Sequence, residues 1–90
     1  MTPEEELGRA QEAEMLMAHP LIKDAIREVR DALIDGIERS AFTDEKLREK
    51  LSQQLVSLSA VVNKLKTHIE TGKLAEETIK RRTASRQVRV

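Results

Sequence analysis

The side chains that could support metal binding are two histidines. His19 and His68 are the only histidines in the 90 residues, and the chain has no cysteine. A metal site needs several converging ligands, and neither histidine belongs to a His, Asp or Glu cluster with ligand spacing. We therefore expect no metal site, and we interpret both histidines as capping or solvated side chains.

Serines and aspartates are the other residues with catalytic potential. Ser52, Ser57 and Ser59 have no neighbouring base in the sequence, so activation of a serine nucleophile would depend on remote residues. Asp31 and Asp35 share a helical face with arginines, which is typical of a solvated charged surface. The three glycines are too widely separated to form a phosphate-binding loop. We expect no enzyme, no cofactor and no small-molecule ligand.

The last 18 residues contain the basic cluster of the chain. Residues 73–90 carry six bases and two acids, whereas residues 1–18 carry five acids and one base. The cluster could neutralise phosphates, dock on an acidic protein surface such as residues 4–14 of a neighbour, or be solvated without a role. No aromatic residue interleaves with it to stack on bases. Its members are Lys80, Arg81, Arg82, Arg86 and Arg89.

The composition favours a small domain that associates with other chains. Phe42 is the only aromatic residue, so the core lacks the large rings that stabilise many small domains. A domain of this size buries little surface and is commonly stabilised by disulfides, metals or oligomerisation. Without cysteines, association is the remedy that we expect, with protein partners or with further copies of the chain.

Caps and breakers divide the chain into four predicted helices. Thr2 and Glu5 form a capping box, Pro20 opens a second helix, and Thr43 caps a third. Gly72 is placed to end the third helix as a C′ residue. The predicted helices cover residues 3–18, 20–40, 44–71 and 73–82 of one domain, 1–82, followed by a non-helical basic tail, 83–90.

The link between the second and third predicted helices is short. A connection of this length between long helices is typical of an αα-hairpin. Phe42 and Leu47 occupy the positions of a hydrophobic staple, which would fix the angle at which the chain enters the third helix.

The third predicted helix carries a heptad seam of apolar residues. The spacing of 4, 3, 4, 3 and 4 residues keeps the seam on one face. It suits either a parallel two-stranded coiled coil or packing against the second helix, and the short link favours the second arrangement. The seam consists of Leu51, Leu55, Leu58, Val62, Leu65 and Ile69.

Signals for a membrane or for secretion are missing from the sequence. The chain begins Met1-Thr2-Pro3-Glu4 without a basic and apolar leader, and no apolar run approaches the roughly 20 residues that span a bilayer. We expect no membrane partner and a soluble, intracellular protein.

Several short motifs between residues 10 and 73 occur together: Ala10-x-x-Ala13, His19-Pro20-Leu21, Thr43-Asp44, Arg48-Glu49-Lys50-Leu51, the ladder of Leu55, Leu58 and Leu65, and Thr71-Gly72-Lys73. With these motifs, residues 10–73 resemble small all-helical proteins encoded by tailed bacteriophages. The resemblance implies a non-enzymatic component of the virion or of head assembly, located in the cytoplasm of the bacterial host or in the virion. It transfers no functional residue, and the basic tail lies outside it.

Together these features predict an all-α fold, a long antiparallel helical hairpin with a shorter N-terminal helix and a basic C-terminal extension. The expected function is structural, with the chain oligomerising or docking inside a larger complex. The alternative is a small regulatory or packaging protein that binds nucleic acid through its basic tail. No recognition helix rich in Arg, Asn and Gln is visible, which disfavours major-groove readout.

Overall fold

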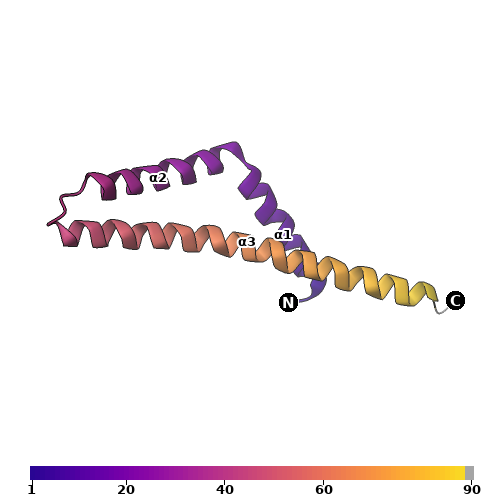
Figure 1. The fold of residues 1–90 in the computed structure, drawn as a ribbon. Helices are drawn as coiled ribbons and strands as arrows, with labels where there is room; N and C mark the ends of the chain where they lie inside the picture. The colour runs from indigo at the N-terminus through magenta and orange to yellow at the C-terminus, as the bar shows by residue number, and fades with distance from the viewer. Residues whose placement is uncertain (89–90) are drawn as a thin grey trace. The chain divides into compact units, whose positions relative to one another are not determined.

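The computed structural model describes residues 1–88 and is all-helical (Figure 1). Helix α1 spans Pro3–Ala18, α2 spans Pro20–Arg39 and α3 spans Glu45–Val88. No strand occurs among the described residues. The predicted all-α class is confirmed, and so are the starts of the first two helices.

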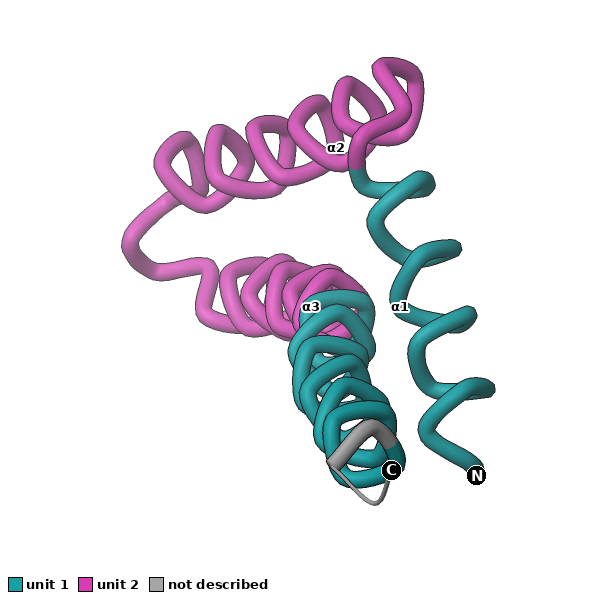
Figure 2. Tube along the Cα trace, turned by 90° about the vertical axis from the view of Figure 1, so that its right-hand side faces the viewer, with its two compact units in different colours: residues 1–17, 64–90 teal, residues 18–63 magenta. Residues whose placement is uncertain are grey.

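The chain divides into two compact units (Figure 2). Unit 1 contains α1 and the part of α3 that begins at Lys64, and unit 2 contains α2 and the part of α3 that ends at Asn63. Helix α3 therefore supplies residues to both units, while α1 and α2 each belong to one.

The starts of α1 and α2 follow the sequence signals. The backbone N–H of Glu5 donates to the Thr2 hydroxyl oxygen at 3.2 Å, and that hydroxyl donates to the Glu5 carboxylate at 3.0 Å. His19 caps α2 through its Nδ1, which accepts from the backbone N–H of Leu21 at 3.1 Å. The bonds donated by the Glu5 and Leu21 amides each satisfy a first-turn N–H that has no partner inside its helix.

Helix α3 begins one residue later than predicted, and its cap is Asp44. The carboxylate of Asp44 accepts from the backbone N–H of Leu47 at 3.1 Å. The Asp44 N–H itself donates to the carbonyl of Ala41 at 2.8 Å, so a turn precedes the helix and moves the cap from Thr43 to Asp44. A carboxylate also suits the positive end of the helix dipole better than a hydroxyl does.

The predicted hydrophobic staple between Phe42 and Leu47 is wrong. Phe42 is 90% exposed and Leu47 is 41% exposed, so neither side chain is covered as a staple pair would be. The shift of the cap to Asp44 explains this result, because it makes Thr43 the N′ residue in place of Phe42.

The predicted helix end at Thr71 is also wrong, because α3 continues through Gly72 as far as Val88. No glycine among the described residues has a positive φ, so Gly72 does not adopt the left-handed conformation of a C′ glycine. The segments predicted as a separate helix, 73–82, and as a non-helical tail from residue 83 are later turns of α3.

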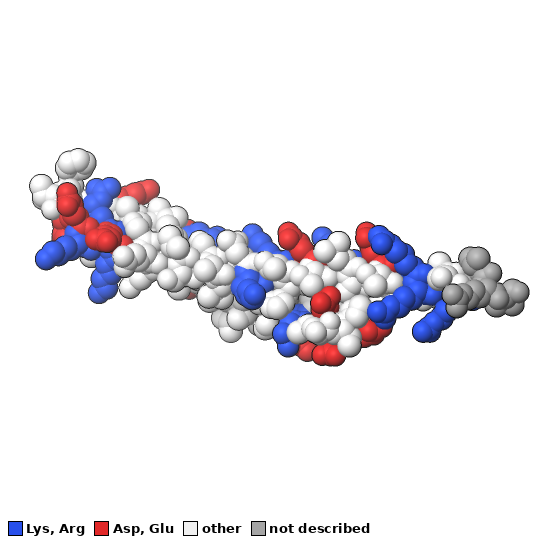
Figure 3. Space-filling model, turned by 90° about the horizontal axis from the view of Figure 1, so that it is seen from below, with Lys and Arg blue, Asp and Glu red and all other residues white. Residues whose placement is uncertain are grey.

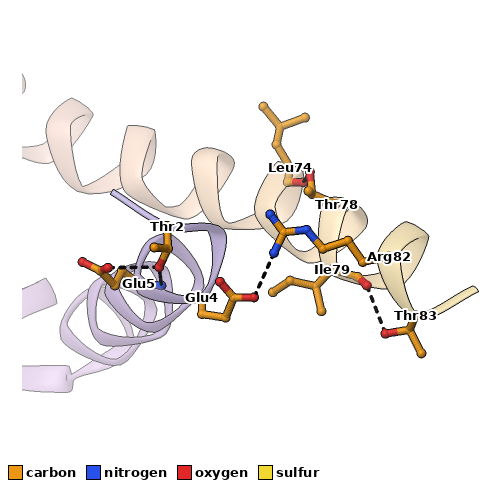
Figure 4. Close-up of polar contacts among 8 residues, drawn as sticks. All are labelled: Thr2, Glu4, Glu5, Leu74, Thr78, Ile79, Arg82 and Thr83. Atoms are coloured by element: carbon orange, nitrogen blue, oxygen red, sulfur yellow. Dashed lines mark hydrogen bonds and ion pairs between the residues drawn. The ribbon is translucent and has the colours of Figure 1, made fainter. Parts of the chain in front are cut away.

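Threonine hydroxyls are bonded along these later turns (Figure 4). Thr78 donates to the carbonyl of Leu74 and Thr83 donates to the carbonyl of Ile79, both at 3.1 Å. Such bonds reach back one turn and need a helical backbone.

Across the described residues, no helix combines the length and the apolar character that crossing a membrane requires.

Substitution of Asp44 tests the start of α3. Asp44→Ala should lower the free energy of unfolding by about 0.5–2 kcal/mol, because it removes the capping acceptor. Thr43→Ala is the matched control and should change stability by less than about 0.5 kcal/mol. Chemical denaturation followed by circular dichroism measures both. A larger loss for Thr43→Ala than for Asp44→Ala would restore Thr43 as the cap.

Candidate interaction surfaces

The six seam residues divide between the two units. Four lie in unit 2 and two, Leu65 and Ile69, lie in unit 1. Val62 is 7% exposed and is the only buried one, while the other five are half-buried. The seam thus faces inward along its whole length, but it is incompletely covered.

Unit 2 is a thin layer of two helices. Gly36 of α2 lies opposite Leu51 of α3, so close that a Cβ on Gly36 would stand 3.1 Å from the Leu51 Cδ1. No residue of α2 is buried, although the helix carries a full apolar stripe. One neighbouring helix can cover only part of such a stripe, and the half-burial of Ile22, Ile26, Leu33 and Ile37 reflects this.

Unit 1 is held by a crossing of small residues that the sequence interpretation missed. Ala10 and Ala13 of α1 are each 3% exposed, Ala75 of α3 is 2% exposed, and Gly72 is buried. A Cβ on Gly72 would overlap the Cβ of Ala10, and it would also approach the carbonyl oxygen of Glu6 at 3.6 Å. Only glycine allows the two helices to approach this closely.

A signal for this crossing is present in the sequence. Ala10 and Ala13 are three residues apart, and so are Gly72 and Ala75. Two small residues at this spacing occupy one face of a helix. The interpretation of Gly72 as a helix terminator concealed the second pair.

An ion pair joins the ends of the helices in unit 1 (Figure 4). Arg82 Nη1 lies 3.3 Å from Glu4 Oε1, and the two side chains are 53% and 61% exposed. A pair this exposed contributes about 0–1 kcal/mol. It brings together the acidic start and the basic end of the chain, the two segments with opposite net charge.

The basic cluster is largely paired with acids. Lys80 lies 3.5 Å from Glu76, and Arg81 lies 3.6 Å from Glu77. No ion pair links Arg86 to another described residue, and Arg89 lies outside the described residues. In Figure 3, blue side chains gather beside the grey C-terminal residues, with red side chains close to them. Consecutive helical residues point about 100° apart, which distributes positions 80–82 around the helix.

An apolar surface on unit 2 has no cover. Its largest side chains are Leu21 (69% exposed) and Val29 (49%) of α2, and Leu47 (41%) and Val61 (61%) of α3. We call these four residues, with the smaller Ala25 and Ala32 between them, the apolar face. All six are exposed, although leucine and valine are normally found inside.

The described residues contain no group of three or more metal-ligating side chains. They contain no buried polar or charged side chain either. A hollow of about 160 Å³ lies beside the Gly72 crossing, with Glu14, Lys73 and Glu76 among its lining residues. Pockets for small ligands are commonly about 300–1,000 Å³, so this hollow is too small to be the candidate functional site.

Comparison of the chain with protein-family models, curated proteins and solved structures finds no match.

Substitution of Gly72 tests the crossing of α1 and α3. Gly72→Ala should cost about 1–3 kcal/mol of stability, because the new methyl group overlaps Ala10. Gly8→Ala is the matched control: it has open space within 4 Å and should stabilise the chain by up to about 1 kcal/mol. Ala10→Gly should recover part of the loss in the Gly72→Ala background. Thermal unfolding of the parent chain and these three variants measures this, and equal stabilisation by both alanines would refute the crossing.

Two neighbouring valines test the assignment of the seam. Val62→Ala should cost roughly 1–3 kcal/mol, because Val62 is buried. Val61→Ala should cost less than about 0.5 kcal/mol at low protein concentration, because Val61 is exposed. Denaturant titrations of both variants measure the difference. The reverse order would mean that α3 is turned relative to its partners.

Proposed function

We propose that the protein is a non-enzymatic helical assembly component that works by packing its helices against another protein surface. The observation that carries the proposal is the exposed apolar face of unit 2, together with the absence of any buried residue in α2. Large exposed apolar patches mark interaction sites on soluble proteins. A layer two helices thick needs a further layer to complete its core.

The proposal treats α2 and the first half of α3 as an antiparallel hairpin. The five residues 40–44 that link the helices and the proximity of Gly36 to Leu51 support this arrangement. The four seam residues of unit 2 then stabilise the hairpin, and the apolar face beside them remains available to a partner. We further propose, from the resemblance to phage proteins alone, that the complex is a virion or a head-assembly intermediate.

The alternative is nucleic-acid binding through the basic end of α3. Three of its four described members already have acidic neighbours: Lys80, Arg81 and Arg82 pair with Glu76, Glu77 and Glu4. Phosphate contacts would have to displace these acids. Their positions around the helix also prevent all of them from facing one nucleic-acid surface. These two observations favour protein docking.

A binding assay with labelled duplex DNA and single-stranded RNA separates the two functions. The proposal predicts no binding at about 0.15 M salt. The alternative predicts micromolar binding that weakens with salt, with a log–log slope of up to about −4 on duplex DNA. The triple variant Lys80→Gln, Arg81→Gln and Arg86→Gln should abolish any such binding, while Lys46→Gln with Lys50→Gln is the charge control. Binding that follows this pattern would overturn the proposed function.

A further inference from the structure

The apolar face lies on one side of the hairpin. A helix turns by about 100° per residue, so Leu21, Ala25, Val29 and Ala32 run along one edge of the half-buried stripe of α2. When two antiparallel helices are viewed along one direction, the residues of one advance clockwise and those of the other counterclockwise. Residues displaced by the same sign of angle from the packed stripe of each helix therefore lie on the same side of the pair. Leu47 and Val61 are displaced from the seam of α3 in this way, so they lie on the same side as the four α2 residues.

The opposite side of the hairpin, called the polar side here, carries fewer apolar residues. At 100° per residue, Lys23 and Arg30 of α2 lie beyond the other edge of the stripe. On α3 that edge carries Arg48, Ser52 and Ser59. Its exposed large apolar side chains are two, Ile34 and Val56, against four on the apolar face. The hairpin is thus a layer with one side better suited to water and one side better suited to a second layer.

We infer that the second layer is the same hairpin of a second copy of the chain, and this inference rests on the proposed function. Residues 45–63 form a helical segment about 28 Å long, and two helices of about 10 Å diameter are about 20 Å wide. Two such faces in contact cover roughly 1,100 Å², which reaches the ~1,000 Å² expected of a specific interface. Two layers of two helices form a four-helix bundle.

The charged residues that border the apolar face, which we call its rim, decide how the two copies are oriented. The rim of α3 carries Lys46 and Lys50, a net charge of +2, whereas the rim of α2 carries Glu28, Asp35 and Arg39, a net charge of −1. Asp35 and Arg39 already pair at 3.1 Å. Placing α3 on the partner's α3 would set lysines against lysines, which is repulsive. The favourable arrangement places α2 of each copy over α3 of the other.

Side-chain sizes agree with this arrangement where Val61 meets the second copy. The proximity of Gly36 to Leu51 fixes the register of the hairpin, and counting from that pair sets Ala25 level with Val62. When the two-fold axis runs along the helices, Val61 of one copy therefore lies near Ala25 of the other. A large residue meets a small one there, as interdigitating layers require.

Light scattering over a hundredfold range of protein concentration tests the second copy. The parent chain should reach twice the 10.2 kDa of one chain. Val61→Glu should raise the dissociation constant by about 100-fold or more, because it buries an unpaired charge, and circular dichroism should show its helices intact. Val56→Glu, on an exposed position of the polar side, should leave dissociation unchanged. A parent chain that stays monomeric, or equal effects of the two variants, would overturn the inference.

Cysteine cross-linking tests the orientation, because the parent chain has no cysteine. Differently tagged chains carrying Ala25→Cys or Val61→Cys should form a mixed disulfide under mild oxidation. The mixture of Ala25→Cys with Val56→Cys should not. Preferential self-linking of Ala25→Cys would show α2 over α2 and contradict the arrangement.

The light-scattering and nucleic-acid binding experiments distinguish failure of this inference from failure of the proposed function. A monomeric chain that binds no nucleic acid removes the second copy and leaves docking on another protein. Salt-sensitive nucleic-acid binding through the end of α3 removes the assembly function itself, whatever the mass in solution.

Discussion

The contact between Gly72 and Ala10 is the constraint on which unit 1 depends. Because a Cβ on Gly72 would overlap that of Ala10, α1 and α3 meet at backbone distance, with Ala13 and Ala75 buried beside them. A glycine inside a helix costs about 1 kcal/mol relative to alanine. The close packing offsets that cost, since helix backbones that meet directly form dispersion contacts without ordering long side chains.

Unit 2 is organised on the opposite principle. It relies on branched aliphatic side chains, because its one aromatic residue, Phe42, is 90% exposed, and Val62 is the only one of its large apolar residues that is buried. The fold thus combines a tightly packed crossing in one unit with an unfinished core in the other. The unfinished core is where a partner has most to contribute, because each apolar side chain that a partner covers adds its own transfer free energy.

Sequence periodicity predicted much of this fold and little of the functional surface. The starts of α1 and α2 and the inward-facing seam follow from caps and apolar spacing, which are local properties. The cap at Asp44 and the passage of α3 through Gly72 were mispredicted, because each depends on atoms outside the local pattern. A preceding turn decides the first, and Ala10, 62 residues away in the sequence, decides the second. The apolar face has no such local signal, since Leu47 and Val61 lie beside the heptad seam and not within it.

The central claim is that the apolar face of unit 2 is covered when the protein functions in solution. Methyl NMR with a soluble paramagnetic probe measures this directly, because four valines of unit 2 differ in exposure: Val29, Val56, Val61 and Val62. At concentrations where the chain associates, the methyl groups of Val29 and Val61 should be shielded from the probe nearly as well as those of buried Val62. Those of Val56 should remain strongly relaxed. Relaxation of Val29 and Val61 as strong as that of Val56 at every concentration would contradict the account.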